Sequence, residues 1–321
     1  MSAHVIRWAN QTEIKTVEWL WKPFIPCGKV TIIEGDGGEG KTTAILAVAA
    51  MLSRGVQPPA LVNGHLQGEQ RIEPITVFYA SNEDEIADST IPRFIRNGGD
   101  LNRLAYSGEL EHHITLTESE ISDIIMETGA KLFIIDPLQS FLPSGTHMGN
   151  VTQMRAVFTM LSNVAKNTGC AIVLVGHLNK NEASKDIHRG LGSADIAASV
   201  RSILLVSMDK NDRAKRCIRA IKSNFDDADY TPIALELDEN RVLSFEEYDE
   251  LENEDRPSQT KLDRAASILR EMLTDGPVPI EDIFAECDAE GIGDRTVRRA
   301  MKKTGAVSQS KDGVTYWRLT N

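Results

Sequence analysis

The chain has 321 residues, 41% of them hydrophobic, which is enough for one large domain and one small domain with packed cores. Its formal net charge of −12 at pH 7 argues against a surface that is basic throughout, so any contact with nucleic acid must come from a local basic patch or an assembled channel. The longest uncharged apolar run, Thr42–Ser53, is too short to cross a bilayer, and Met1–Trp8 lacks the apolar core of a signal peptide. We therefore expect a soluble, cytoplasmic protein with no membrane partner.

Three of the four tryptophans, Trp8, Trp19 and Trp21, lie in the first 26 residues. We predict that this segment packs on the first strand, because burial in a core is the commoner fate of such residues. Stacking of one tryptophan on adenine is the alternative.

The four cysteines stand singly in the sequence, at Cys27, Cys170, Cys217 and Cys287, with no C-x-x-C pair. This spacing indicates neither a disulfide framework nor a zinc site. Buried free thiols are the expected state.

Residues 35–42 read Gly-Asp-Gly-Gly-Glu-Gly-Lys-Thr, a G-x-x-x-x-G-K-[ST] phosphate-binding loop. The apolar run Val30–Ile33 before it predicts a buried strand, and Thr43–Ser53 after it predicts a helix. The glycines let backbone N–H groups turn toward a phosphate, and a helix that begins at Lys41 directs the positive end of its dipole at the same anion. We expect Lys41 to bridge the β- and γ-phosphates of ATP and the Thr42 hydroxyl to hold Mg²⁺. The predicted nucleotide-binding residues are Gly35, Asp36, Gly37, Gly38, Glu39, Gly40, Lys41, Thr42 and Thr43.

The next predicted strand, Ile75–Ser81, runs into the acidic cluster Asn82-Glu83-Asp84-Glu85. The carboxyl ends of parallel strands face the ligand crevice, so we expect Glu83 to lie beside the phosphates. Acidic residues that favour the start of a helix over 86–97 are the alternative. Both can hold, because Asp84 and Glu85 can favour the helix while Glu83 faces the nucleotide.

Two further predicted strands end in polar residues. Lys131–Pro137 has four apolar residues followed by Asp136, which is the Walker B pattern. We expect this strand to adjoin the phosphate-loop strand, with Asp136 holding the water shell of Mg²⁺. The strand Ala171–Val175 leads through Gly176 to His177, which we expect to sense the γ-phosphate; a histidine satisfied in a turn is the alternative.

From Val200 the pattern changes to successive β segments joined by polar turns, so we expect the sheet to end in an antiparallel meander. Seven of the ten residues over 246–255 are acidic, which indicates a solvated linker. The predicted domains are 1–248 for the nucleotide-binding domain, 249–260 for the acidic linker and 261–321 for a second, smaller domain.

The smaller domain has the order helix, helix, helix and hairpin, which is that of a winged helix-turn-helix domain. Its helices are predicted over 265–273, 280–290 and 294–304, and its hairpin over 307–320. The third helix is basic, and we expect it to contact DNA through some of Arg295, Arg298, Arg299, Lys302 and Lys303. A basic solvated helix, or a domain that docks a protein, is the alternative.

The motifs taken together resemble the RecA-like ATPases, and most closely the RepA-type hexameric replicative helicases of plasmids, phages and mobile elements. The matching segments are Trp19–Trp21, Ile25–Lys29, Gly35–Thr43, Ser81–Asp84, Ile134–Pro137, Gly176–Lys180, Arg189-Gly190 and Val200–Ser202. The resemblance, which covers about 25–245, implies an α/β fold with a RecA-like P-loop core, a mostly parallel sheet and an antiparallel extension. A winged-helix tail of the kind found on such ATPases matches more loosely.

The resemblance also implies roles for individual residues. Glu83 would polarise the attacking water, Asp136 would coordinate Mg²⁺, and His177 would sense the γ-phosphate. Basic residues late in the domain would reach the nucleotide of the neighbouring subunit, which points here to Arg201 and Lys222. Such helicases often carry an arginine two residues beyond the position of Lys222, where this chain has Asn224.

The expected function is that of an ATP-hydrolysing, DNA-associated motor: a replicative helicase that works as a homo-oligomeric ring. Single-stranded DNA would pass through the ring, or duplex DNA would bind the C-terminal domain. The alternative is an ATP-dependent DNA-binding regulator or initiator without strand separation. A small-molecule kinase is disfavoured, because nothing in the sequence resembles an acceptor pocket.

Overall fold

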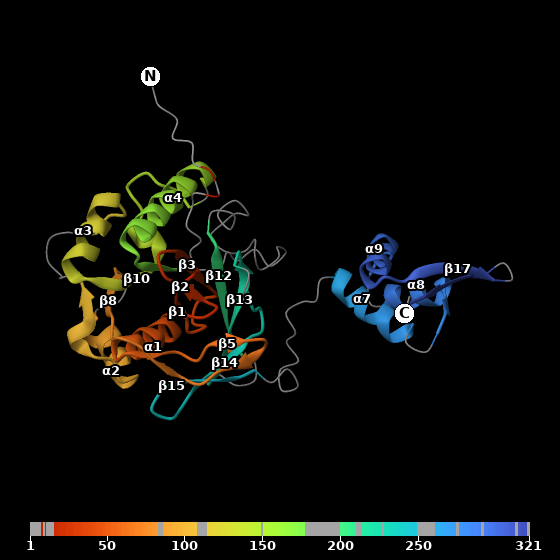
Figure 1. Ribbon diagram of the computed structural model, residues 1–321, viewed down its shortest axis with the longest axis horizontal. Helices are drawn as coiled ribbons and strands as arrows, with labels where there is room; N and C mark the ends of the chain where they lie inside the picture. Colours follow the sequence, from red (N-terminus) through yellow and green to blue (C-terminus); the bar gives the residue numbers. More distant parts are fainter. Residues whose placement is uncertain are drawn as a thin grey trace, which may run out of the picture. The chain divides into compact units, whose positions relative to one another are not determined.

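The computed structural model describes residues 8, 10, 16–82, 86–107, 114–148, 150–176, 200–209, 214–225, 228–248, 261–273, 276–289, 292–311 and 314–319. The chain divides into two compact units, Met1–Asp249 and Glu250–Asn321 (Figure 1). Across the described ranges, no helix combines the length and the apolar character needed to span a membrane.

The first unit is built on a sheet that has nine strands in its described part. In spatial order they are β15 (Leu243–Glu247), β14 (Ile233–Leu237), β13 (Lys215–Ser223), β12 (Ser202–Met208), β3 (Val30–Glu34), β11 (Ala171–Val175), β10 (Ala130–Asp136), β8 (Thr76–Ser81) and β9 (Leu104–Tyr106). The strands from β12 to β9 are parallel, and β12 to β15 form an antiparallel meander. This sheet confirms the predicted α/β fold with a mostly parallel sheet and an antiparallel extension.

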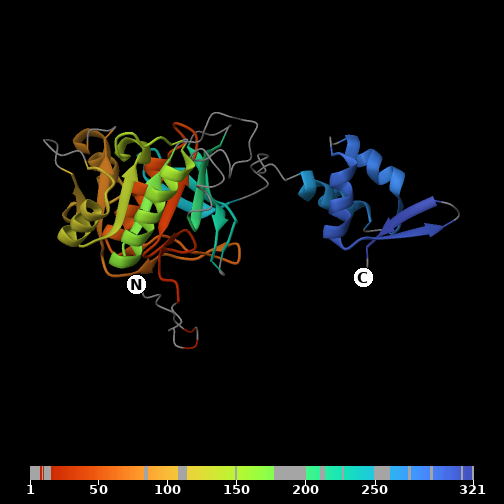
Figure 2. The ribbon, with the colours of Figure 1, turned by 90° about the horizontal axis from the view of Figure 1, so that it is seen from above.

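The central strands are buried on both faces, because helices cover the two sides of the sheet. One face packs on α1 (Lys41–Ser53) and α2 (Ile91–Arg96), the latter preceded by the π-helical turn η2 (Ile86–Thr90). The other face packs on α3 (Glu118–Thr128) and α4 (Val151–Thr168); Figure 2 shows α4 lying across the strands. Alternate residues of each strand serve the two cores, as Ile33 and Ile32 of β3 do.

One prediction about the sheet is wrong. The Walker B strand β10 does not adjoin the phosphate-loop strand β3, because β11 lies between them and pairs with both. Strand order depends on whether each new strand is added to one edge of the sheet or the other, or between existing strands. The apolar runs of the strands carry no signal for that choice. The carboxyl ends of β3 and β10 nevertheless stand at the same edge of the sheet, since all three strands are parallel.

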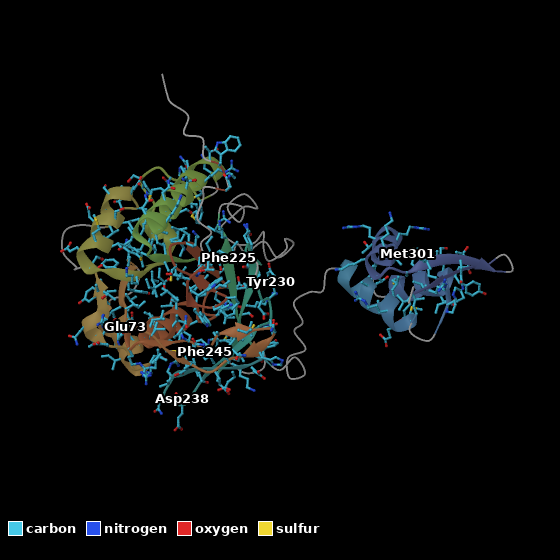
Figure 3. All side chains as sticks on the ribbon, in the orientation of Figure 1. Glu73, Phe225, Tyr230, Asp238, Phe245 and Met301 are labelled. Carbon is cyan, nitrogen blue, oxygen red and sulfur yellow. The ribbon has the colours of Figure 1, made fainter. Side chains whose placement is uncertain are left out.

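Short elements surround this core. They are β1 (Trp19–Trp21), β2 (Ile25–Pro26), β4 (Val56–Gln57), β5 (Leu61–Val62), β6 (His65–Leu66), β7 (Gln70–Arg71), η3 (Leu101–Arg103) and η4 (Leu138–Phe141). Trp21 is 1% exposed, donates from Nε1 to the Pro59 carbonyl at 2.9 Å and packs on Phe245, labelled in Figure 3. Trp8 is 69% exposed, so the expected packing holds for Trp21 but not for Trp8.

The cysteines differ in their burial. Cys170 and Cys287 are buried, as predicted, and burial raises the pKa of the Cys170 thiol to about 12. Cys27 and Cys217 are only half-buried, so the prediction is wrong for these two. All four are free thiols.

The second unit contains α7 (Lys261–Met272), β16 (Val278–Pro279), α8 (Ile280–Ala289), α9 (Asp294–Thr304), β17 (Val307–Lys311) and β18 (Val314–Arg318). Its strands form a sheet in the order β16-β18-β17, so a short strand between the first two helices joins the predicted hairpin. Val297 and Ala300 of α9 are buried in its core, next to which Met301 (Figure 3) packs. The assignment of this unit to the winged-helix class stays a prediction.

Candidate nucleotide-binding site

The loop between β3 and α1 has a backbone that requires glycine at its last turn. Gly40 caps α1 in the left-handed conformation, with φ 92° and ψ 22°, and Gly38 also has a positive φ of 85°. A Cβ atom on Gly40 would collide with the Arg216 side chain at its Nε. The loop therefore keeps its shape only because these positions lack side chains.

Lys41 is held inside this loop. Its ammonium group donates to the carbonyl oxygens of Gly35 at 2.8 Å and Asp36 at 2.7 Å, and the residue is 4% exposed. Burial lowers the pKa of this ammonium, while the nearby carboxylates of Glu39, Asp136 and Asp36 counter that shift. Glu39 also accepts from the Asp36 backbone N–H at 2.8 Å, which ties the loop to itself.

The Walker B carboxylate meets the first turn of α1. The Thr42 hydroxyl donates to Oδ2 of Asp136 at 2.6 Å, and the Tyr79 hydroxyl donates to the same oxygen at 2.9 Å. Asp136 is 8% exposed and Tyr79 is 1% exposed, so the carboxylate is fixed in a largely dry position. Hydroxyl and carboxylate oxygens are the ligands that Mg²⁺ prefers, so the donor set fits this ion.

A cavity of about 300 Å³ opens over the loop. Its lining residues are Gly38, Gly40, Lys41, Thr42, Thr43, Tyr79, Ser81, Arg93, Asp136, Arg216 and Arg241. Within this described lining, four side chains are basic and one is acidic. The excess of basic side chains favours the binding of an anion.

Sequence reasoning missed several residues of this site. Tyr79 lies inside a predicted apolar strand, and Arg216 and Arg241 lie in the predicted antiparallel meander, where no local motif marks them as site residues. Glu34, the last residue of β3, is outside this lining, but it is 2% exposed, and burial raises the pKa of its carboxyl to about 8. The signal that could have found the arginines is their place near strand ends in the meander.

The structure describes two of the other four predicted catalytic residues. Glu83 and His177 fall outside the described residues. Arg201 is exposed, and Lys222 donates to the Val200 carbonyl at 2.7 Å. Burial, followed by the proximity of Arg201, lowers the pKa of the Lys222 ammonium. Neither residue lines the cavity.

The predicted DNA-binding side chains lie on α9. Arg298, Arg299, Lys302 and Lys303 are exposed, whereas the side chain of Arg295 falls outside the described residues. The guanidinium carbon of Arg298 lies 5.1 Å from the centre of the Phe284 ring, a cation–π distance. Phe284 packs against the core of the second unit, so Arg298 also contacts its own domain.

Sequence comparison matches this chain to a known family. The sequence profile of the AAA domain family matches residues 2–183. The DNA repair protein RadA of Synechocystis sp. is 27% identical over 203 residues, covering 62% of this chain and 37% of that protein. RadA of Brucella abortus is 31% identical over 160 residues, covering 48% of this chain and 29% of that protein. This chain thus spans well under half the length of these curated relatives.

Among solved structures, a KaiC-like protein of Pyrococcus horikoshii OT3 superposes with a TM-score of 0.48 at 15% sequence identity, covering 68% of this chain and 91% of that one. The family match extends over more than half of the chain and includes the phosphate loop and Asp136. The chain therefore belongs to the AAA domain family of P-loop ATPases.

Proposed function

We propose that this chain is an ATP-hydrolysing motor that acts on DNA, and that its specific form is a hexameric helicase of the RepA type. The observation that carries the proposal is the contact between Thr42 and Asp136, with 2.6 Å between their oxygens, at the mouth of a glycine loop that encloses Lys41. One cavity thus contains a phosphate-binding loop, the ammonium group of Lys41, and the Thr42 and Asp136 oxygens, which are of the kind that binds Mg²⁺.

In this proposal the described residues bind and position the nucleotide. Backbone N–H groups of the loop and the ammonium of Lys41 hold the phosphates, and Thr42 and Asp136 would hold Mg²⁺. The ion, when bound, supplies neutralisation of the phosphate charge. The hydroxyl of Tyr79 keeps the Asp136 carboxylate in place.

The remaining roles are assigned by the family resemblance. Glu83 orients the attacking water, and His177 responds to the γ-phosphate. Arg201 and Lys222 stand outside the cavity of their own chain, which is compatible with their acting on the nucleotide of a neighbouring subunit in a ring. Hydrolysis then depends on assembly, because the basic residue that stabilises the transition state comes from the next subunit.

Two observations support the association with DNA. The curated relatives cited above are named as DNA repair proteins. In addition, α9 presents four exposed basic side chains within its described residues, on a chain whose net charge is −12. A basic helix on an otherwise acidic chain is a local electrostatic footprint for nucleic acid.

ATP hydrolysis with and without single-stranded DNA tests the proposal. Lys41→Ala is expected to abolish hydrolysis, because it removes the positive charge from the β- and γ-phosphates. Lys131→Ala is the matched control, since Lys131 is exposed and lies outside the cavity. Wild-type protein that hydrolyses no ATP in the presence of DNA would refute the motor.

A second assay separates the helicase from the regulator. Wild-type protein is mixed with ATP and either a forked duplex or a library of duplex sequences. Unwinding of the fork supports the helicase. ATP-dependent binding to one sequence without unwinding supports a DNA-binding regulator or initiator instead.

A further inference from the structure

The antiparallel meander brings basic residues to the edge of the sheet where the phosphate loop lies. Because β13 runs opposite to β12, its first residues stand where the parallel strands end. The turn between β14 and β15 returns to the same edge, since β14 runs antiparallel to β13. Arg216 is the second residue of β13, and Arg241 lies in the turn between β14 and β15.

Arg216 is packed against the loop itself. Its side chain fills the space next to Gly40 that a Cβ atom would otherwise occupy. One guanidinium nitrogen donates to the Ala214 carbonyl at 3.1 Å, but the buried Nε has no hydrogen-bond partner among the described residues. A buried donor without a partner is unfavourable, so this position calls for an acceptor.

Arg241 occupies a backbone conformation that is unusual for its residue type. Its φ is 62°, one of two positive values for non-glycine residues among those described. Asp238, labelled in Figure 3, fixes the turn: its carboxylate accepts from the Val242 N–H at 2.7 Å and its carbonyl from the Arg241 N–H at 2.8 Å. This hairpin geometry places the Arg241 side chain in the lining of the cavity.

The two arginines also act on each other. Burial, followed by the proximity of Arg241, lowers the pKa of the Arg216 guanidinium. Both side chains line the cavity that contains Lys41 and Thr42. Two guanidinium groups held close together repel, and an anion between them removes that repulsion.

We propose that Arg216 and Arg241 form an arginine clamp that holds the phosphate chain of the nucleotide against Gly40 of the same subunit. The clamp rests on the proposed function, since it takes ATP as the ligand of the cavity. It divides the work within a ring: each subunit binds ATP with its own arginines, and only hydrolysis needs a neighbour.

Calorimetric titration of the full chain with ATP, ADP and adenosine tests the clamp. Arg216→Gln and Arg241→Asn are the variants, because glutamine keeps much of the aliphatic stem and asparagine tolerates a positive φ. Each is expected to weaken ATP binding about tenfold to a hundredfold, the loss of one charge-assisted contact, with adenosine binding unchanged. Arg219→Gln is the matched control, since it removes the same charge from the opposite face of β13.

Thermal unfolding without nucleotide gives a second readout that separates a ligand-binding role from a structural one. Removing either arginine relieves the repulsion, so both variants are expected to unfold at a temperature equal to or above that of the wild type. The rise in unfolding temperature on adding ATP is expected to shrink. If Arg216→Gln fails to fold, Arg216→Lys, which keeps the charge, and Arg241→Asn carry the test.

The outcomes are distinct. ATP affinity in both variants equal to that of Arg219→Gln would overturn the clamp, and so would an equal loss of ATP and adenosine binding, which would place the arginines on the base or ribose. If Lys41→Ala loses ATP affinity while the clamp variants do not, the clamp falls and the nucleotide site stands. Wild-type protein that binds no ATP would overturn both.

Discussion

Tyr79→Phe offers a sharp test of how the Walker B carboxylate is held. The phenylalanine ring fills the same space in β8, so the substitution removes only the hydroxyl that donates to Asp136 at 2.9 Å. Tyr79 is 1% exposed, so the phenylalanine side chain stays buried in the same position. A hydrogen bond to a charged group contributes about 1.5–3 kcal/mol, and because the Thr42 hydroxyl remains on the same oxygen we expect the lower value, about 1.5 kcal/mol.

Two measurements follow from that value. The melting temperature of the first unit is expected to fall by about 3–6 °C, since a domain of this size shifts by about 2–4 °C per kcal/mol. The concentration of Mg²⁺ that half-saturates ATP hydrolysis is expected to rise about tenfold, because a residue that orients a metal ligand affects the affinity for the metal.

The control for both assays is Tyr106→Phe, which removes a hydroxyl from a tyrosine that is 42% exposed on the edge strand β9. This variant is expected to behave like the wild type. The reasoning would be refuted if Tyr79→Phe matched Tyr106→Phe in melting temperature and in its Mg²⁺ response.

Three further predictions concern other parts of the chain. Glu34→Gln is expected to raise stability near pH 8 and to change nothing at pH 4: the pKa of the buried carboxyl is raised to about 8, so the native state binds more protons and wild-type stability falls between about pH 4.5 and 8. Melting temperatures measured across that pH range, with the exposed Glu18→Gln as control, test this. The prediction is wrong if the melting temperatures of both variants change with pH in the same way. Arg201→Ala and Lys222→Ala are expected to keep ATP affinity and to lower hydrolysis, and mixing either with Lys41→Ala subunits should restore part of the activity; a lack of rescue would argue for action within one subunit. Changing Arg298 and Arg299 together to alanine is expected to lower the slope of log affinity for duplex DNA against log salt by up to about 2, at about 0.9 for each phosphate contact, and binding equal to the wild type would favour a protein-docking role.

The sequence predicts best what depends on neighbouring residues. The phosphate loop is defined by glycines that the backbone needs at adjacent positions, and the flanking strand and helix follow from local patterns. The bounds of α9 agree with the prediction for the same reason, because one turn of helix already shows its apolar and basic faces.

Contacts between distant segments were harder to predict. Tyr79 and Asp136 are 57 positions apart in the chain, and Thr42 and Asp136 are 94 apart. The first contact depends on the pairing of β8 with β10, and the second spans a sheet in which β11 lies between β3 and β10; no local pattern specifies either arrangement. Arg216 and Arg241 enter the cavity only because the meander returns twice to one edge of the sheet.

The two carbonyl oxygens that hold Lys41 have a thermodynamic consequence. An arriving phosphate competes with the Gly35 and Asp36 carbonyls for the same ammonium protons, so binding exchanges hydrogen bonds and adds few new ones. The free energy gained from this lysine is then the difference between its hydrogen bonds to a charged phosphate oxygen and those to the neutral carbonyl oxygens. A ligand with less negative charge at that point gains little from the exchange, and the loop thereby discriminates among anions by charge as well as by shape.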